Sequence, residues 1–321
     1  MTPALLDRWR RRLRRTSPEG AGPPIESECL TIDLPGMVAK EFATEYPRAA
    51  DATSRVLAAI DGADLSPLAR RSPSLAGYDW TSYLRCSICR IVRVLRALSD
   101  HARPAARILD VGAYFGNFGL ACRAAGFAVD AVDSYSQYGE ALAPCVALQR
   151  EAGIVVHDFA DVGYDLSSLQ DCYDAVVCAG VIEHIPHTPR RMLEALTAAL
   201  KPGAVLVLDT PNLAYLYKRL ALLEGKTIFA PIAQQYFTDL PFEGHHREYT
   251  IPELEWMLSE VGHEIVSIDT FNYSVFGQST LQGEHLEYYR EMENDPAMRE
   301  VIMAVSRRPF AEAAGAGGKK I

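Results

Sequence analysis

The stretch "ILDVGAYFGNFG", residues 108–119, decides how the rest of the chain is interpreted. It predicts a short apolar strand with an acidic residue near its end, followed by a turn in which Gly112 and Gly116 open a helix. The dinucleotide fingerprint G-x-G-x-x-G would need glycine at its third and sixth positions, which are Tyr114 and Asn117 here. A phosphate-binding P-loop fails as well, because no Gly-Lys-Ser/Thr follows. The pattern D-x-G-x-x-x-G therefore favours a cofactor without phosphate.

Apolar strands and amphipathic helices alternate along the chain from this point. Strands that alternate with helices at this spacing form a parallel sheet with helices on both faces. Right-handed crossovers then bring the carboxyl ends of the strands to one edge, where ligands bind. The sequence predicts an α/β fold with a doubly wound, mostly parallel sheet of seven strands. These strands are expected at residues 106–111, 127–133, 153–159, 173–180, 204–212, 263–269 and 299–309.

The alternation is confined to the central and later parts of the chain. The expected regions are a basic flexible tail (1–25), an N-terminal helical region (26–104), the main domain (105–310) and a disordered tail (311–321). Within the main domain the rhythm breaks over residues 213–250, which we interpret as an inserted lid over the ligand-binding edge. After this insertion Thr250 and Glu253 form the sequence pattern of a capping box, which predicts a new helix.

Three local expectations concern the helices and linkers. Residues 16–30 are rich in Pro, Gly and Ser and read as a linker, and residues 137–152 as one helix. The apolar residues of the helix expected over 78–101 recur at helical spacing. Its arginines are then expected on the exposed side: Arg85, Arg90, Arg93 and Arg96.

Composition limits the classes of function. The formal charge of −9 disfavours a general nucleic-acid binder. The six arginines between Arg8 and Arg15 suit either weak contact with an anionic membrane or a solvated terminus, which we favour. No apolar run suggests a membrane span, and the seven scattered cysteines are typical of reduced thiols, so a cytoplasmic location is expected. Cys86 and Cys89 form a lone CxxC without a second pair, and no metal site is expected.

The glycine turn resembles the first motif of the class I S-adenosylmethionine-dependent methyltransferases, usually written D-V-G-x-G-x-G. This cofactor carries no phosphate, and an acid such as Asp110 can lie near its positive sulfonium and ammonium groups. Tyr114 departs from the family pattern and adds a side chain beside the cofactor. The resemblance covers residues 105–310 and implies S-adenosylmethionine as the cofactor. In the turn, the resemblance implies that the cofactor contacts Asp110, Gly112, Ala113, Tyr114 and Gly116.

Later motifs follow in the order found in the family. Asp133 ends the second strand 23 residues after Asp110, and a carboxylate there can accept both hydroxyls of a ribose. In the family this acid binds the cofactor ribose, and Ser134 follows it. The resemblance implies that Asp158 and Phe159 contact the adenine. It also implies that the methionine part lies over Cys178 and Ala179.

Methyl transfer to a hydroxyl needs a base. The candidate bases lie just after the fourth strand and at the end of the insertion. His184, in "IEHIP", is the preferred base, with a scaffold role as its alternative, and Glu183 beside it is either a base or a loop anchor. His245 and His246 are candidates from the exit of the lid, with a polar hinge as the alternative. The lid aromatics could line an acceptor pocket, surround the sulfonium or form a core of their own: Tyr236, Phe237 and Phe242.

The segments "IEH", "DTPN" and "HHREYT" resemble the methyltransferases that modify hydroxyls of quinone precursors, sugars and secondary metabolites. O-methylation of a small molecule is therefore expected. Alternatives are N-methylation of an amine, or a methyltransferase-like protein that binds the cofactor without transferring its methyl group. The aromatic insertion could also be a homodimer contact rather than a lid.

Overall fold

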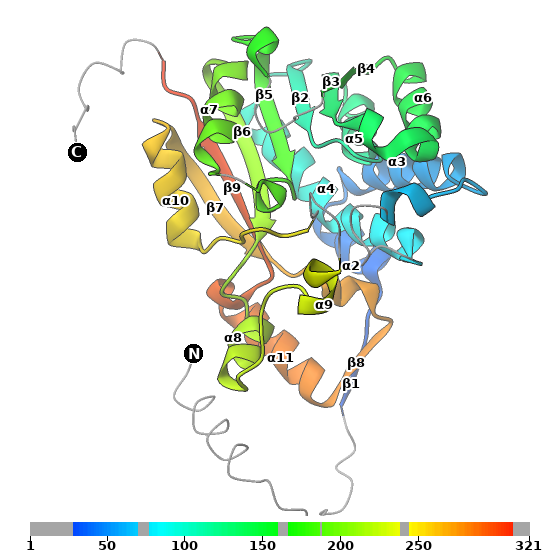
Figure 1. The fold of residues 1–321 in the computed structure, drawn as a ribbon, viewed down its shortest axis with the longest axis vertical. Helices are drawn as coiled ribbons and strands as arrows, with labels where there is room; N and C mark the ends of the chain where they lie inside the picture. Colours follow the sequence, from blue (N-terminus) through cyan, green and yellow to red (C-terminus); the bar gives the residue numbers. More distant parts are fainter. Residues whose placement is uncertain (1–27, 70–76, 160–165, 187, 238–243, 311–321) are drawn as a thin grey trace, which may run out of the picture.

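A seven-stranded sheet forms the centre of the molecule (Figure 1). The computed structural model describes residues 28–69, 77–159, 166–186, 188–237 and 244–310. The strand order is β4-β3-β2-β5-β6-β9-β7, and β9 runs antiparallel to the other six strands. This confirms the expected doubly wound, mostly parallel sheet. The strands are β2 (Arg107–Val111), β3 (Ala128–Asp133), β4 (Val155–Asp158), β5 (Tyr173–Ala179), β6 (Leu200–Pro211), β7 (Glu264–Phe271) and β9 (Val301–Arg307).

Helices cover both faces of the sheet. On one face, α4 (Trp80–His101), α5 (Asn117–Ala124) and α6 (Ala143–Glu151) pack against the sheet, α3 (Tyr46–Ala59) packs on these helices, and α2 (Leu34–Glu41) packs on α3. The other face packs against α7 (Arg190–Ala199) and α10 (Ile251–Glu260). Helix α10 begins with the expected capping box, since Thr250 and Glu253 exchange both capping hydrogen bonds.

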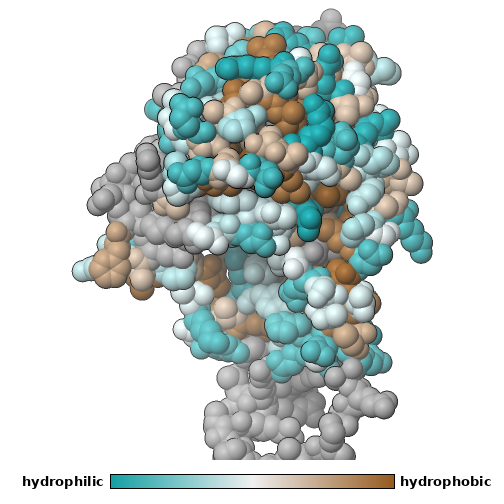
Figure 2. All heavy atoms as spheres, turned by 90° about the vertical axis from the view of Figure 1, so that its right-hand side faces the viewer, coloured by the Kyte–Doolittle hydropathy of each residue, from teal (hydrophilic) through white to brown (hydrophobic). Residues whose placement is uncertain are grey.

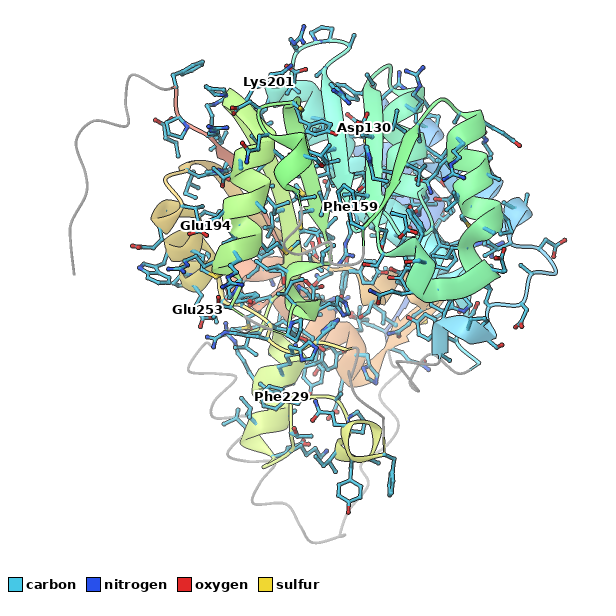
Figure 3. The ribbon with its side chains drawn as sticks, turned by 45° about the horizontal axis from the view of Figure 1, so that its top comes forward. Asp130, Phe159, Glu194, Lys201, Phe229 and Glu253 are labelled. Atoms are coloured by element: carbon cyan, nitrogen blue, oxygen red, sulfur yellow. The ribbon has the colours of Figure 1, made fainter. Side chains whose placement is uncertain are left out.

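A smaller group of elements lies beyond the carboxyl ends of β6 and β7, at the bottom of Figure 1. Seen from the side, the surface is hollowed between this lower part and the main body (Figure 2). Figure 3 shows Lys201, at the amino end of β6, and Phe229, within the insertion, at opposite ends of the molecule. The lower elements are β1 (Cys29–Thr31), β8 (Thr280–Gln282), α8 (Leu216–Leu223), α9 (Ile232–Tyr236) and α11 (Gly283–Asn294).

Four local expectations are wrong. Residues 29–31 form β1, which pairs with β8, instead of belonging to a linker. The expected helix over 137–152 is broken at Gly139, whose φ of 58° separates the 3-10 helix η3 (Tyr135–Leu142) from α6. Arg90 and Arg93 are mostly buried, with side chains 12% and 18% exposed. Their charges are accommodated by Asp209 and by the rings of Phe42 and Phe271.

The lid aromatics also depart from the expectation. Tyr236 and Phe237 are 77% and 80% exposed, so in this structure they neither line a pocket nor form a core. Phe242, the terminal segments 1–25 and 311–321, and the arginine tract lie outside the described residues. The remaining 3-10 helices are η1 (Ser66–Ala69), η4 (Ser167–Leu169), η5 (Ile182–His184), η6 (Ser274–Gly277) and η7 (Pro296–Met298).

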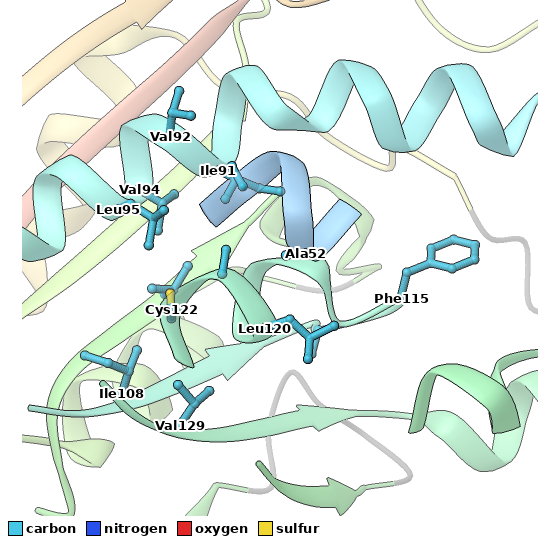
Figure 4. Packing of buried hydrophobic residues seen from close by; sticks show 14 of the residues in the cluster. Ala52, Ile91, Val92, Val94, Leu95, Ile108, Phe115, Leu120, Cys122 and Val129 are labelled. Atoms are coloured by element: carbon cyan, nitrogen blue, oxygen red, sulfur yellow. The ribbon is translucent and has the colours of Figure 1, made fainter. Parts of the chain in front are cut away.

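The core on the α4 side holds the glycine turn in place. Figure 4 shows Ile91 and Leu95 of α4 next to Cys122 of α5, with Ile108 and Val129 of the sheet beneath. Cys86 and Cys89 are buried residues of α4, so the CxxC spacing here belongs to a packed helix. Among the described helices, none combines the length and the apolar character needed to cross a bilayer.

Candidate functional site

The turn after β2 has a strained backbone. Gly112 and Gly116 have φ values of 73° and 79°, and Tyr114 between them has a φ of 47°. A tyrosine in this left-handed region is unfavourable by roughly 1–2 kcal/mol, so the surroundings must stabilise it. The amides of Gly112 and Ala113 both donate to Val132 O, at 2.9 and 3.2 Å. The turn is therefore attached to the end of β3.

The glycines of the turn also fit tightly against their neighbours. A Cβ on Gly112 would lie 2.3 Å from Val181 Cγ2, whereas a Cβ on Gly126, with a φ of 95°, would meet nothing within 4 Å. We expect Gly126→Ala to lose about 1 kcal/mol from backbone strain alone. Gly112→Ala should lose a further 1–3 kcal/mol or so from overpacking. Urea denaturation measures both, and equal losses would show that the contact with Val181 carries no weight.

Asp133 closes the turn. Its Oδ2 accepts from Tyr114 N at 2.7 Å, and its Oδ1 accepts from Ser134 N at 2.7 Å. The first of these bonds helps to offset the strain at Tyr114. Burial raises the pKa of Asp133 to about 6 despite these hydrogen bonds. Oδ1 also accepts from the Tyr138 hydroxyl at 3.3 Å. A ribose diol can therefore bond to the second acceptor position of Oδ2 and replace this longer contact at Oδ1.

Asp110 lies beneath the turn. It is 5% exposed, and burial together with the charge of Asp133 raises its pKa to about 7. Its Oδ2 has no hydrogen-bond partner within the described part of the chain. Two buried carboxylates thus lie next to each other with little positive charge to balance them. The expected contact between Asp110 and the sulfonium remains a prediction.

Aromatic rings surround the side chain that departs from the glycine pattern. The Tyr114 ring centroid lies 4.5 Å from that of Phe115, 5.3 Å from that of Tyr138 and 6.0 Å from that of Trp80. Trp80 is the first residue of α4. Tyr114 therefore packs the cofactor turn against the N-terminal helical region.

The residues expected at the adenine lie at the end of β4. Asp158 is exposed and accepts from Ser136 N through both carboxylate oxygens at 3.1 Å. Phe159 N donates to Asp133 O at 3.0 Å, which keeps β4 next to the ribose candidate. His157, in the same strand, has its Nε2 3.4 Å from Asp130 Oδ2.

The end of β5 adjoins the glycine turn and the end of β6. Cys178 pairs in register with Val111, and Ala179 with Asp209. The side chain of Cys178 is fully buried in the core on the α7 side, so only its backbone can pass under a ligand. Glu183, two residues after Val181, is 2% exposed and accepts from Thr210 Oγ1 at 3.1 Å. Burial raises the pKa of Glu183 to about 7.

Two of the three predicted histidines meet at this edge. The ring centroids of His184 and His245 are 4.8 Å apart at an interplanar angle of 85°. One nitrogen of each ring and one oxygen of Glu183 lie within 4.8 Å of one another, a grouping that could hold a metal ion. His246 is not in this group; its amide donates to Glu183 O at 2.8 Å.

A carboxylate orients His245. Glu248 Oε1 lies 2.8 Å from His245 Nδ1, and Glu248 Oε2 pairs with Lys218 of α8. With Nδ1 bonded to the carboxylate, Nε2 carries the lone pair. Burial and the neighbouring His184 lower the pKa of His245 to about 3, so its imidazole is neutral at physiological pH.

A family model described as a methyltransferase domain matches residues 80–268, which is more than half of the chain. The chain belongs to the methyltransferase-domain family. Membership confirms the class I fold and S-adenosylmethionine as its cofactor. The residues present fit that group, because the buried Asp110 carboxylate, with one oxygen lacking a hydrogen-bond partner, suits the cationic sulfonium and ammonium. Asp133, at the end of the neighbouring strand, suits the ribose diol.

Curated relatives of this methyltransferase-domain chain match over its central part. A ubiquinone biosynthesis O-methyltransferase from Xanthomonas campestris pv. campestris is 34% identical over 119 residues, covering 35% of this chain and 45% of that protein. One from Rickettsia canadensis is 27% identical over 125 residues, covering 38% of this chain and 51% of that protein. The chain spans about half the length of these relatives.

Among solved structures, a S-adenosylmethionine-dependent methyltransferase from Mesorhizobium loti is 19% identical with a TM-score of 0.46, covering 68% of this chain and 97% of that one. A second, from Archaeoglobus fulgidus, is 17% identical with a TM-score of 0.46, covering 67% of this chain and 91% of that one.

Four charged residues near this edge were not predicted as site residues from the sequence: Arg90, Asp209, Lys218 and Glu248. Arg90 Nε lies 3.1 Å from Asp209 Oδ2, and both side chains are buried. A charged residue within an apolar helical stripe could have signalled Arg90. The sequence holds no comparable signal for the pairing of Lys218 with Glu248, which lie 30 residues apart within the insertion.

Proposed function

We propose that the protein transfers the methyl group of S-adenosylmethionine to a hydroxyl of a small-molecule acceptor. The observation that carries this proposal is the His184–His245 pair at the carboxyl edge of the sheet, one strand from the glycine turn. An amine acceptor would need no base beside the reacting atom, so the imidazole pair favours a hydroxyl. The curated relatives, which are O-methyltransferases by name, support the same class.

The chain's own residues would position the reactants and remove one proton. When bound, S-adenosylmethionine supplies an electrophilic methyl on a positive sulfur. His245 Nε2 would accept the hydroxyl proton as the acceptor oxygen takes up that methyl group, and the sulfur would keep the electron pair of its bond to the methyl carbon. The oxygen becomes strongly acidic during this step, so a neutral imidazole of low pKa is a sufficient base. Orientation contributes most of the remaining rate enhancement.

Incubation with S-adenosylmethionine and a panel of hydroxylated small molecules tests this function. The expected products are S-adenosylhomocysteine and an acceptor heavier by one methylene unit, both measured by mass spectrometry. Calorimetric titration with S-adenosylmethionine and NAD runs in parallel. Binding of S-adenosylmethionine without any transferred methyl would favour the non-methylating alternative, whereas binding of NAD alone would overturn the proposal.

Asp133→Asn is expected to weaken S-adenosylmethionine binding by about 10–100-fold, because a neutral amide replaces a charged acceptor of two ribose hydroxyls. Isothermal titration calorimetry measures the change. Asp171→Asn is the matched control, since this exposed carboxylate pairs with Arg308 and precedes the amino end of β5, away from the carboxyl edge of the sheet. Equal affinities for wild type and Asp133→Asn would remove Asp133 from the cofactor site.

The partners of the chain are also proposals. The exposed apolar side chains of the insertion, Phe229, Ile232 and Phe237, support a homodimer contact. Light scattering of Phe237→Ser should then show a larger monomer fraction than the wild type, and an unchanged mass would contradict the contact. The cytoplasmic location and membrane contact through Arg8–Arg15 rest on composition alone.

A further inference from the structure

A cavity of about 250 Å³ lies among the elements beyond the carboxyl ends of the strands. Tyr215 and Tyr217 reach it from the segment after β6, Ser274 from the segment after β7, and Glu300 from the residue before β9. Helix α11 closes another side through His285. The lining residues lie outside the strands of the seven-stranded sheet, so the accessory elements form this cavity.

Tyrosine rings and hydroxyl groups dominate its walls. The Tyr217 hydroxyl lies 3.0 Å from His285 Nδ1, and the two rings stack with an interplanar angle of 25°. Burial, followed by the charge of Glu300, raises the pKa of both Tyr215 and Tyr217 to about 12. Their phenols therefore stay protonated and offer neutral hydrogen bonds beside flat apolar surfaces.

Charge in the cavity disfavours an anionic occupant. The described lining holds one carboxylate, that of Glu300, and no lysine or arginine. Glu300 already accepts from the amides of Tyr273 and Ser274, at 2.8 and 2.5 Å, and from Ser274 Oγ at 2.7 Å. A ligand carboxylate or phosphate would face this acid without a compensating cation.

The cavity adjoins the histidine pair through two consecutive residues of α8. Tyr217 lines the cavity, and Lys218 pairs with Glu248, which holds His245. On another side Tyr273, next to the lining residue Ser274, lies 5.0 Å below the guanidinium of Arg90. Both links lead to the carboxyl edge of the sheet, where the candidate base lies.

We infer that this cavity seats the ring of an uncharged, hydroxylated monocyclic aromatic acceptor. The inference rests on the proposed function and names its substrate class. The volume is below the roughly 300–1,000 Å³ of pockets for drug-sized ligands, which suits a single substituted ring. The three lining tyrosines, which include Tyr289, supply ring faces for stacking and hydroxyls for orientation.

Calorimetric titration with catechol, and with protocatechuate as its carboxylated counterpart, tests the inference on the full chain. Gln278 is an exposed lining residue, so Gln278→Trp should fill the cavity without disturbing the core. Glu287→Trp, on the exposed surface of α11 outside the lining, is the control. Catechol should bind the wild type and Glu287→Trp equally, and bind Gln278→Trp at least about tenfold more weakly. Protocatechuate should bind the wild type more weakly than catechol.

Binding of S-adenosylmethionine to each variant separates this inference from the function on which it rests. It should be unchanged in Gln278→Trp. Equal catechol binding by Gln278→Trp, tighter binding of protocatechuate, or no catechol binding at millimolar concentration would each overturn the inference, even if methyl transfer to another acceptor is found. Catechol binding that Gln278→Trp abolishes, without any methyl transfer, would support the cavity and count against the proposed reaction.

Discussion

His184→Ala and His245→Ala should each lower kcat for a hydroxyl acceptor by about 10²–10⁴-fold, the usual contribution of a general base. The two rings contact each other at the carboxyl edge, so loss of either one disturbs the proton acceptor. His246→Ala is the matched control, because its contact with Glu183 is made by the backbone amide and survives the substitution. Equal losses in all three variants would indicate a structural effect and contradict the assignment.

The pH profile gives an independent test of this base. The pKa of His245 is lowered to about 3, so its reactive neutral form persists at every pH above about 4 and is lost only as the pH falls through 3. The pKa of Glu183 is raised to about 7, and a carboxylate base would lose its reactive form as the pH falls through 7. Because Asp110 and Asp133 also have raised pKa values, of about 7 and about 6, the profile is measured as kcat at saturating S-adenosylmethionine, where loss of their charge does not lower the occupancy of the cofactor site. A flat kcat profile between pH 8 and pH 5 is expected, and a tenfold fall over that range would transfer the role to Glu183.

Arg90→Met should lower the free energy of unfolding by about 3–5 kcal/mol at pH 8, because it leaves buried carboxylates without their cation. Asp209 and Glu183 both have pKa values raised to about 7 by burial. An acid whose pKa is raised on folding contributes stability that is present below its unfolded pKa and lost as the pH rises through the folded value. The loss in Arg90→Met should therefore be smaller at pH 5.5.

Urea denaturation at both pH values measures this effect. Arg190→Met is the matched control, since its side chain is 75% exposed and pairs with the exposed Glu194. That surface pair should contribute less than about 1 kcal/mol. A loss for Arg90→Met that is the same at pH 5.5 and pH 8 would show that packing over Tyr273, rather than charge, accounts for it.

The sheet could be predicted from the sequence because each strand is an apolar run bounded by glycine, proline or an acid. The accessory elements could not. β1 and β8 are three residues each and pair across 249 positions, from Thr31 to Thr280, so no local pattern marks them. Helix α11 is largely polar and shows no strong apolar stripe, and the break at Gly139 depends on a single backbone conformation.

The cofactor side of the site was more predictable than the acceptor side. Asp110 and Asp133 are adjacent in space because they end neighbouring parallel strands, which the fold alone dictates. Lys218 and Glu248 meet through the path of the insertion, which local spacing does not encode. The burial of Arg90 could not be predicted from its own helix, because its charge is balanced by Asp209, a residue 119 positions away.

The insertion leaves and rejoins the sheet at nearly the same point. Asn212 bridges to Tyr249, and Leu213 N donates to Tyr249 O at 2.9 Å. The free energy of closing a loop between fixed ends rises only with the logarithm of its length. The segment between these anchors can therefore be exchanged as a cassette in evolution or in engineering. Such an exchange would replace Lys218, His245 and Glu248 together, giving a new acceptor preference while the methyl donor's binding site stays intact.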